Sequence, residues 1–461
     1  MEGITVRDLT EATGGKLLCG DMHAQVAHIR LDSRNVGKGD LFVPLVGEKV
    51  DAHRFIPQVL EQGAAAVLTA EHDRAESDAA WIRVADTKKA LQDIGRYIRK
   101  RLTLPLVGVT GSVGKTTTRE MIASALSAAF RVYRTPGNSN SQVGVPVTIS
   151  EISSADQVGV IELGMSEPGE LTVIAQIAQI DMAVITNIGI THIEQLGSRE
   201  NIYREKLTIQ DGLKKDGVLI LNGDDDMLRN TRGRDGIRTV YYGTGENCDF
   251  RAEEIRMADG KTCFTAVHGS ERQPVKLRVM GLHNVSNAMA AIAVCAQCGM
   301  TMKQAAEGLY TFRGFAHRQQ IFSGSRLTVM DDSYNASPAS MKAAVDVFME
   351  LKKGSRHVAV LADMKELGEN TPEYHRQVGE YAGKAGISLI VALGEASREL
   401  AAAARAVSDV KTVEFEDRGQ MESYLEEELK EGDCVLFKGS NSMGLSVTAE
   451  KFLREAGTET E

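Results

Sequence analysis

The fold is decided by residues 108–118, which read GVTGSVGKTTT. An apolar run at 106–109 precedes the glycines, and apolar residues at helical spacing follow them. A strand, a glycine-rich turn ending in Gly-Lys-Thr and a helix, in this order, are typical of a phosphate-binding loop. The match is imperfect, because Val109 stands where the general motif has its first glycine. The helix is predicted to bury a face made of Met121, Ile122, Ala125, Leu126 and Ala129.

The residue types of this loop suit a nucleoside triphosphate. Glycines let backbone N–H groups approach phosphate oxygens closely, and the N-terminus of the following helix adds positive potential. Lys115 can reach the terminal phosphates, and the hydroxyl of Thr116 can ligate Mg²⁺. The predicted nucleotide contacts in the loop are Gly111, Ser112, Val113, Gly114, Lys115, Thr116 and Thr117.

Two later apolar runs end in polar residues that belong at the same edge of a parallel sheet. Glu162 ends the first run, and Asn187 and His192 follow the second. Ligands of open α/β sheets bind at the carboxyl ends of the strands. We therefore predict that Glu162 holds the metal ion and that His192 has a metal or substrate role.

Short apolar runs alternate with helical patterns along most of the chain, which predicts an α/β fold. We expect three domains, at residues 1–84, 85–313 and 314–461. The first contains a strand-like run at 41–46. The central domain is predicted to hold a mainly parallel sheet, with antiparallel strands between about 245 and 280. The third restarts the alternation and is predicted to be a second doubly wound, Rossmann-like sheet.

The composition argues against several classes of protein. The 461 residues are 43% hydrophobic and 25% charged, as in ordinary globular proteins. A net charge of −10 disfavours a general nucleic-acid binder or a binder of anionic membranes. Six cysteines are spread thinly, and no run approaches the ~18 apolar residues of a membrane span. We expect a cytoplasmic protein with no membrane span and no nucleic-acid partner.

Five segments resemble the Mur ligases, which are ATP-dependent amide-forming enzymes of peptidoglycan synthesis. They occur in that family's order and span nearly the whole chain. The segments are TGSVGKTTT (110–118), TPGNSNSQVGVP (135–146), ELG (162–164), ITNIGITHIEQLGS (185–198) and GLHNVSNAMAA (281–291). The compact first segment is similar to the family's own phosphate loop, which accounts for the imperfect match to the general motif.

Three further segments narrow the resemblance within the family. They are DDSYNASPASM (331–341), LADMKELGE (361–369) and KGSNSMG (438–444), and residues 31–55 resemble a UDP-binding domain. The resemblance implies an N-terminal UDP-binding domain, a central ATP-binding domain and a C-terminal ligase domain. The implied activity joins D-alanyl-D-alanine to UDP-N-acetylmuramoyl-tripeptide through an acyl phosphate, with ATP and two Mg²⁺ ions, in a monomer.

The resemblance also implies roles by position. Lys115 would contact the ATP phosphates and Thr116 one Mg²⁺, while Glu162 and His192 help to hold the two metals. Lys206 matches a lysine that the family often carries as a carbamate on the second Mg²⁺. Further nucleotide contacts are implied for Asn284, Asn287, Arg318 and Asp332. Substrate contacts are implied for Ser33, Arg34, Asn138, Asn140, Asn187, Tyr334, Asn335, Lys438, Gly439 and Ser440.

Two other functions remain as alternatives. One is another ligase of the same superfamily, either tripeptide-forming or of the folylpolyglutamate type. The other is a P-loop GTPase, which would need an N-K-x-D guanine motif that the sequence lacks. The third residue of the tripeptide, lysine or diaminopimelate, stays open, as does the general base for the incoming amine. Asn441 stands where the family usually has arginine after KGS.

Overall fold

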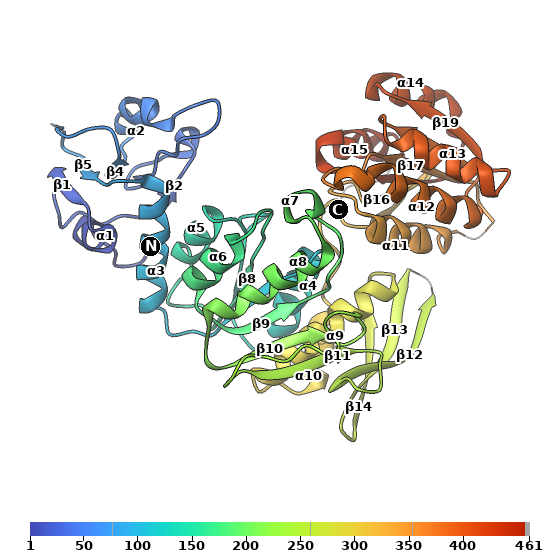
Figure 1. The fold of residues 1–461 in the computed structure, drawn as a ribbon, viewed down its shortest axis with the longest axis horizontal. Helices are drawn as coiled ribbons and strands as arrows, with labels where there is room; N and C mark the ends of the chain where they lie inside the picture. The colour runs from blue at the N-terminus through green and yellow to red at the C-terminus, as the bar shows by residue number, and fades with distance from the viewer. Residues whose placement is uncertain (76, 259, 353, 457–461) are drawn as a thin grey trace.

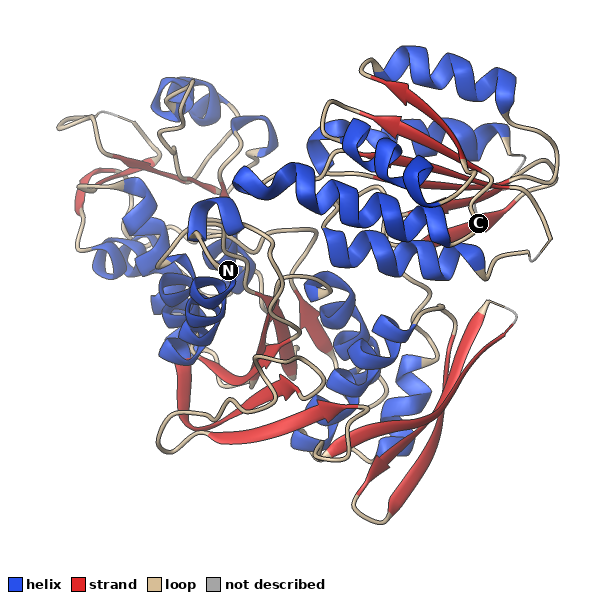
Figure 2. Cartoon of the chain, turned by 45° about the vertical axis from the view of Figure 1, so that its right-hand side comes forward, coloured by secondary structure: helices blue, strands red, loops and turns tan. Residues whose placement is uncertain are grey.

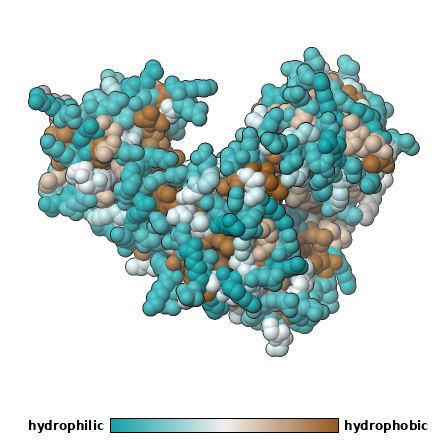
Figure 3. All heavy atoms as spheres, in the orientation of Figure 1, coloured by the Kyte–Doolittle hydropathy of each residue, from teal (hydrophilic) through white to brown (hydrophobic). Residues whose placement is uncertain are grey.

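The computed structural model describes residues 1–75, 77–258, 260–352 and 354–456. Their strands form three sheets of five, nine and six strands, which follow one another along the chain (Figure 1). The sheets form three lobes, and the N-terminal and C-terminal lobes stand apart above the central one (Figure 3). The predicted three-part α/β architecture is confirmed, whereas the exact domain boundaries stay a prediction.

The N-terminal sheet has the order β1-β5-β4-β3-β2, with only β1 antiparallel to its neighbour. Its strands are β1 (Lys16–Cys19), β2 (Ile29–Arg30), β3 (Leu41–Phe42), β4 (Ala66–Thr69) and β5 (Ala80–Arg83). Its helices are α1 (Val6–Thr13), η1 (Ser33–Asn35), η2 (Ala52–Phe55) and α2 (Ile56–Glu61). The strand expected at 41–46 ends at Phe42, and Pro44 has no N–H to continue a ladder.

The central sheet has the order β14-β13-β12-β11-β10-β9-β6-β8-β7. It is parallel from β7 to β12, and β12, β13 and β14 pair antiparallel, as predicted for this region. These last strands extend away from the helices (Figure 2). The strands are β6 (Leu106–Thr110), β7 (Val132–Arg134), β8 (Val158–Glu162), β9 (Ile180–Ile185), β10 (Leu213–Asn222), β11 (Arg238–Gly243), β12 (Phe250–Ala258), β13 (Lys261–His268) and β14 (Glu271–Leu277).

Helices cover this sheet, and the glycine-rich loop at 111–114 lies between β6 and the helix α4. They are α3 (Thr87–Arg101), α4 (Lys115–Leu126), α5 (Gly144–Ser150), α6 (Glu170–Ala178), α7 (Ile193–Leu196), α8 (Arg199–Leu207), η3 (Thr208–Gly212), α9 (Leu282–Gln297) and α10 (Met302–Leu309). Met121, Ile122, Ala125 and Leu126 of α4 are fully buried, as predicted. Ala129 was predicted wrongly: α4 ends at Leu126, and Ala129 is exposed in the turn that follows.

The C-terminal sheet has the order β15-β16-β20-β17-β18-β19 and is parallel except for β15. Its strands are β15 (Gln320–Ser323), β16 (Thr328–Asp331), β17 (His357–Ala362), β18 (Leu389–Leu393), β19 (Lys411–Phe415) and β20 (Cys434–Lys438). Its helices are α11 (Pro338–Met349), η4 (Gly368–Asn370), α12 (Thr371–Lys384), α13 (Ser397–Val407), α14 (Arg418–Glu428), η5 (Asn441–Met443) and α15 (Leu445–Glu455). In the part of the chain that the structure describes, no helix is long and apolar enough to cross a membrane.

Helix α3 joins the N-terminal and central lobes and contacts α1, α5 and α6. Arg99 on α3 is 2% exposed, and its guanidinium donates hydrogen bonds to the carbonyls of Ala178 (2.7 Å), Gln179 (2.9 Å) and Leu102 (3.0 Å). It also forms an ion pair of 3.2 Å with Asp181. Burial lowers the pKa of Arg99, and Asp181 opposes that shift. A single buried cation therefore connects α3 to the end of α6 and the start of β9.

Replacing this arginine is expected to destabilise the protein. Arg99→Ala should lower the free energy of unfolding by about 3 kcal/mol, because buried carbonyls lose a charged donor and cannot reach water. Urea unfolding followed by circular dichroism measures the change. Arg96→Ala is the matched control on the same helix, since Arg96 makes a partly exposed 2.9 Å pair with Asp93 worth less than ~1 kcal/mol. Equal losses in the two variants would contradict the role of Arg99.

Candidate active site

One large cavity, of about 1010 Å³, lies between the central and C-terminal sheets. It opens at the carboxyl ends of β6, β8 and β9 and is closed on the other side by the start of α11 and part of α12. Eighteen predicted residues line it: Ser112, Val113, Gly114, Lys115, Thr116, Thr117, Asn138, Asn140, Glu162, Asn187, His192, Asn284, Asn287, Arg318, Asp332, Tyr334, Asn335 and Lys438. Segments far apart in sequence therefore share one site.

Six predicted residues lie outside the lining. Gly111 precedes the lining residue Ser112, Lys206 lies in α8, and Gly439 and Ser440 follow Lys438 at the end of β20. Ser33 and Arg34 belong to η1 of the N-terminal lobe, where the exposed Arg34 pairs with Asp32 at 2.5 Å. The cavity therefore contains most of the residues expected to contact the nucleotide and the dipeptide. The residues expected to contact the uridine nucleotide lie outside it, in the N-terminal lobe.

The phosphate loop is held by the first residues after β9. The Val113 N–H donates to Asn187 Oδ1 (3.0 Å), and Asn187 Nδ2 donates back to the Val113 carbonyl (2.9 Å). The Thr186 hydroxyl donates to the same carbonyl at 2.6 Å. Gly111 has φ +151°, and a Cβ there would lie 1.8 Å from Thr186 Oγ1, so only glycine fits. The loop is therefore a fixed cradle of backbone N–H groups, as a triphosphate requires.

The Lys115 side chain lies along this cradle. Its Nζ donates to the Gly111 carbonyl at 2.8 Å. Burial lowers the pKa of Lys115, Glu162 opposes the shift and Arg318 adds to it. Lys115 Nζ also donates to the Ser112 carbonyl at 3.5 Å. An ammonium held by neutral carbonyls in this cradle is well placed to exchange those contacts for an anionic phosphate.

Glu162 is tied into a buried network that the sequence did not predict. It is 2% exposed, its Oε2 pairs with Arg119 at 3.0 Å, and its Oε1 accepts from Asn140 at 2.8 Å. Arg119 is completely buried and also binds Glu120 and the Gly137 carbonyl. The available signal was an arginine at the buried-face spacing of α4, three residues before Ile122. The network fixes the carboxylate at the edge of the cavity.

His192 makes a contact between the central and C-terminal sheets. Its Nδ1 lies 2.6 Å from Glu366 Oε2, in the loop after β17. This contact is the main reason that the pKa of Glu366 is lowered, and burial opposes it. Both residues have left-handed backbones, with φ of +65° and +63°. Strained conformations of this kind persist where the surroundings hold them, often at functional sites. Glu366 was not singled out from the sequence.

Lys206 is buried in α8, with 2% exposure. Burial lowers its pKa well below the ordinary value, and Lys115 lowers it further, whereas Glu205 opposes the shift. The neighbouring Glu205 carboxylate accepts from the N–H groups of Gly169 and Leu171 instead. Among the described residues, none forms a hydrogen bond or ion pair with the Lys206 ammonium. A buried amine beside another cation favours its neutral form.

Two asparagines of α9 lie beside the phosphate loop. Asn287 Oδ1 accepts from the Thr118 hydroxyl at 2.9 Å, and its amide donates to Asn284 Oδ1 at 3.2 Å. Asn284 in turn donates to the Met280 carbonyl at 2.7 Å. Both are buried at the cavity wall. The chain of hydrogen bonds fixes their orientation beside the phosphate loop.

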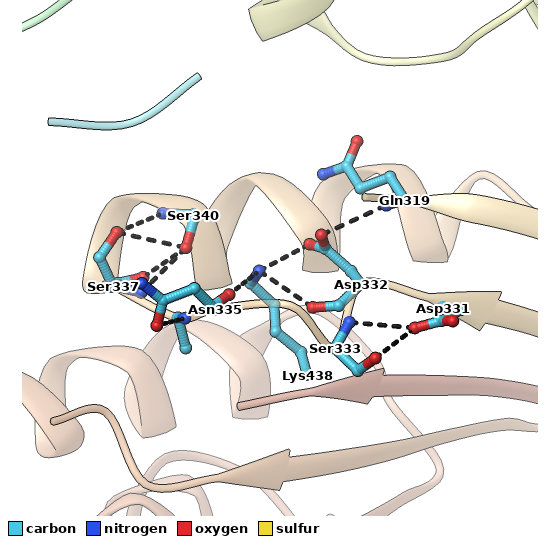
Figure 4. Close-up of polar contacts among 9 residues, drawn as sticks. Gln319, Asp331, Asp332, Ser333, Asn335, Ser337, Ser340 and Lys438 are labelled. Atoms are coloured by element: carbon cyan, nitrogen blue, oxygen red, sulfur yellow. Dashed lines mark hydrogen bonds and ion pairs between the residues drawn. The ribbon is translucent and has the colours of Figure 1, made fainter. Parts of the chain in front are cut away.

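The C-terminal lobe supplies a second set of fixed polar groups. Lys438 Nζ pairs with Asp332 at 2.7 Å and donates to the Asn335 carbonyl at 3.0 Å (Figure 4). The Arg318 guanidinium lies 3.9 Å from the centre of the Tyr334 ring. Burial lowers the pKa of Arg318, and Asp332 opposes the shift. Asn441 donates to the Tyr334 carbonyl at 3.2 Å, so it supports this segment through the backbone.

Comparison with known proteins agrees with this geometry. The "Mur ligase family, catalytic domain" matches residues 25–99, the "Mur ligase middle domain" residues 109–295 and the "Mur ligase, glutamate ligase domain" residues 317–441. The UDP-N-acetylmuramoyl-tripeptide--D-alanyl-D-alanine ligase of Bacillus subtilis is 36% identical, with 96% of each chain covered. The enzyme of that name from Escherichia coli is 32% identical over 99% of this chain and 100% of its own.

Solved structures of similar proteins share the fold of this chain. MurF from Acinetobacter baumannii superposes with a TM-score of 0.89 at 30% identity, covering 98% of both chains. MurF from Thermotoga maritima, solved in complex with ADP, has a TM-score of 0.82 at 27% identity, covering 94% of this chain and 98% of its own. With full-length relatives above 30% identity and the shared three-sheet architecture, the chain belongs to the Mur ligase family.

Proposed function

We propose that this protein is the ATP-dependent ligase that joins D-alanyl-D-alanine to UDP-N-acetylmuramoyl-tripeptide. The products would be the UDP-linked pentapeptide, ADP and phosphate, made in the cytoplasm by a monomer. The observation that carries the proposal is the single cavity in which a phosphate loop, led by Lys115, meets Tyr334 and Asn335 of the C-terminal lobe. The full-length relatives that bear this name support it.

A carboxylate is a poor electrophile, so amide formation needs activation. In the proposed reaction a terminal carboxylate oxygen of the tripeptide attacks the γ-phosphorus of ATP, and ADP leaves. The dipeptide nitrogen then attacks the acyl carbon, loses one proton, and phosphate departs. Phosphoryl transfer depends on positioning and charge neutralisation, which the cradle, Lys115 and Arg318 would supply. Asn284 and Asn287 would orient the adenine, with Asp332 near the ribose.

The donors that line this cavity would suit a divalent metal ion. Thr116 and Glu162 provide oxygen donors of the kind that Mg²⁺ prefers, and His192 adds a nitrogen at its rim. A carbamate on Lys206 would provide oxygens where the buried amine provides none. Two Mg²⁺ ions, when bound, would neutralise the charge that develops on the transferred phosphoryl group.

The rest of the substrate would lie along neighbouring surfaces. Asn138, Asn140 and Asn187 line the cavity where the tripeptide end would enter. Ser33 and Arg34 would face the uridine diphosphate in the N-terminal lobe, and Gly439 and Ser440 would support the dipeptide end. We propose the domain limits 1–84, 85–313 and 314–461 for these three functions.

The proposed reaction is tested by following phosphate release. With ATP, Mg²⁺ and UDP-N-acetylmuramoyl-tripeptide, release is expected to need added D-alanyl-D-alanine, because the acyl phosphate is consumed only by the dipeptide amine. A coupled phosphate assay measures the rate, and mass spectrometry identifies the pentapeptide product. Tripeptides ending in lysine and in diaminopimelate are compared. Release that is independent of the dipeptide, or that needs a single amino acid instead, would contradict the proposal.

The role of Lys206 is tested by substitution and rescue. Lys206→Ala is expected to reduce kcat by about 100-fold or more, because a ligand of the phosphoryl-transfer site is lost. Short carboxylic acids such as formate or acetate should restore part of the activity by replacing the carbamate oxygens. Arg204→Ala, an exposed change on the same helix, is the control and should keep normal activity. If the variant unfolds like the native protein but short carboxylic acids do not restore its activity, the proposal that Lys206 carries a carbamate is contradicted.

A further inference from the structure

The incoming dipeptide brings a charge that the site must receive. Its amine reacts at the phosphate end of the cavity, and its C-terminal carboxylate lies at the other end of the molecule. A cation on the wall of the C-terminal lobe, away from the phosphate loop, would fit this carboxylate.

Five cations line the cavity: Lys115, Arg199, Arg318, Lys342 and Lys438. Three are already engaged. Lys115 lies in the phosphate loop, Arg199 pairs with Asp226, and Lys438 pairs with Asp332 at 2.7 Å. Arg318 lies over the Tyr334 ring, close enough to Lys115 and Glu162 for their charges to interact, which is the phosphate end. Lys342 is the remaining cation of the lining.

Lys342 lies on the second turn of α11, in the wall that the C-terminal lobe contributes to the cavity. Asn335, Ser337 and Ser340 form the polar start of this helix beside Lys438 (Figure 4). Tyr374 and Gln377 of α12 line the same wall of the cavity. Lys342 therefore stands on the C-terminal wall of the cavity, beside two uncharged polar side chains.

The lysine is also kept free of acidic partners. Asp346 is its i+4 neighbour, the usual ion-pair position on a helix, but the Asp346 carboxylate accepts from the Tyr381 hydroxyl. The Lys342 ammonium instead lies 5.6 Å from the centre of the Tyr381 ring. Within the described ranges, no carboxylate pairs with Lys342. A cation–π contact supports the side chain without cancelling its charge.

We propose that Lys342 binds the C-terminal carboxylate of the incoming dipeptide and so determines specificity for a free acid. The inference rests on the proposed function and adds the residue that recognises one end of its second substrate. The Tyr374 hydroxyl and the Gln377 amide are uncharged, and they would complete the pocket around that carboxylate.

The experiment compares D-alanyl-D-alanine with its C-terminal amide, D-alanyl-D-alaninamide, in the native protein and in Lys342→Ala. The native protein is expected to use the amide at least ~10-fold less efficiently in kcat/KM, equivalent to about 1.4 kcal/mol. Lys342→Ala should raise KM for the dipeptide by ~10-fold or more and bring the ratio of the two substrates close to one. KM for ATP and for the UDP-linked tripeptide should stay within ~2-fold of the native values.

Two further variants make the outcome specific. Lys342→Arg keeps the charge and should retain most of the preference for the acid. Lys384→Ala, an exposed lysine of α12 outside the cavity, should change neither constant. Native-like thermal unfolding of each variant shows that the fold is kept.

The outcomes separate the two proposals. A native protein that turns over the dipeptide, but whose preference for the acid survives in Lys342→Ala, overturns this inference and leaves the proposed function standing. A native protein with no dipeptide-dependent phosphate release overturns both. An amide used as well as the acid by the native protein also overturns the inference.

Discussion

The site depends on the reciprocal pair of hydrogen bonds between the Asn187 side chain and the main chain of Val113. A glycine-rich loop has little intrinsic preference for one conformation, because glycine loses more freedom on ordering than any other residue. The amide of Asn187 satisfies a donor and an acceptor of the loop at once, and the Thr186 hydroxyl adds a second bond to the same carbonyl. The strand β9 therefore determines the shape of a loop that begins at β6.

Buried charge is arranged in the same way throughout the cavity. Glu162 is compensated by Arg119 within the central lobe, and Asp332 by Lys438 within the C-terminal lobe. Burying a charge is costly unless it is paired and hydrogen-bonded. The two pairs allow carboxylates to stand at the cavity edge in fixed positions. The Lys115 ammonium, in contrast, donates to the neutral carbonyls of Gly111 and Ser112, so its positive charge is suited to a polyphosphate.

Local patterns predicted the three-part α/β architecture, the phosphate loop and the polar residues after two buried strands, and the family resemblance supplied the other predicted residues of the cavity lining. The phosphate loop, Glu162 and His192 follow buried strands, and parallel strands bring their carboxyl ends to one edge. The strands β7 and β11 were not predicted, because each is short or polar at its start and is held by its neighbours in the sheet. The spacing along α4 indicates only that Arg119 is buried; the partners of Arg119 and Glu366 could not be predicted, since they lie 43 and 174 residues away. The burial of Lys206 likewise arises only when α8 packs against the rest of the central lobe, so its own segment does not predict it.

The two outer lobes are attached to the central one in different ways. The N-terminal lobe is attached through α3. The Tyr97 hydroxyl on this helix donates to Asp8 of the N-terminal lobe at 2.6 Å, and Arg99 donates to the Ala178 carbonyl of the central lobe. The C-terminal lobe follows a short connection in which His317 and Gln319 have left-handed backbones, at φ +58° and +51°. A rotation of the N-terminal lobe about α3 would have to break the hydrogen bond between Tyr97 and Asp8. A rotation of the C-terminal lobe about its short connection would have to break the pair of His192 and Glu366, and it would carry Lys342 relative to the phosphate loop.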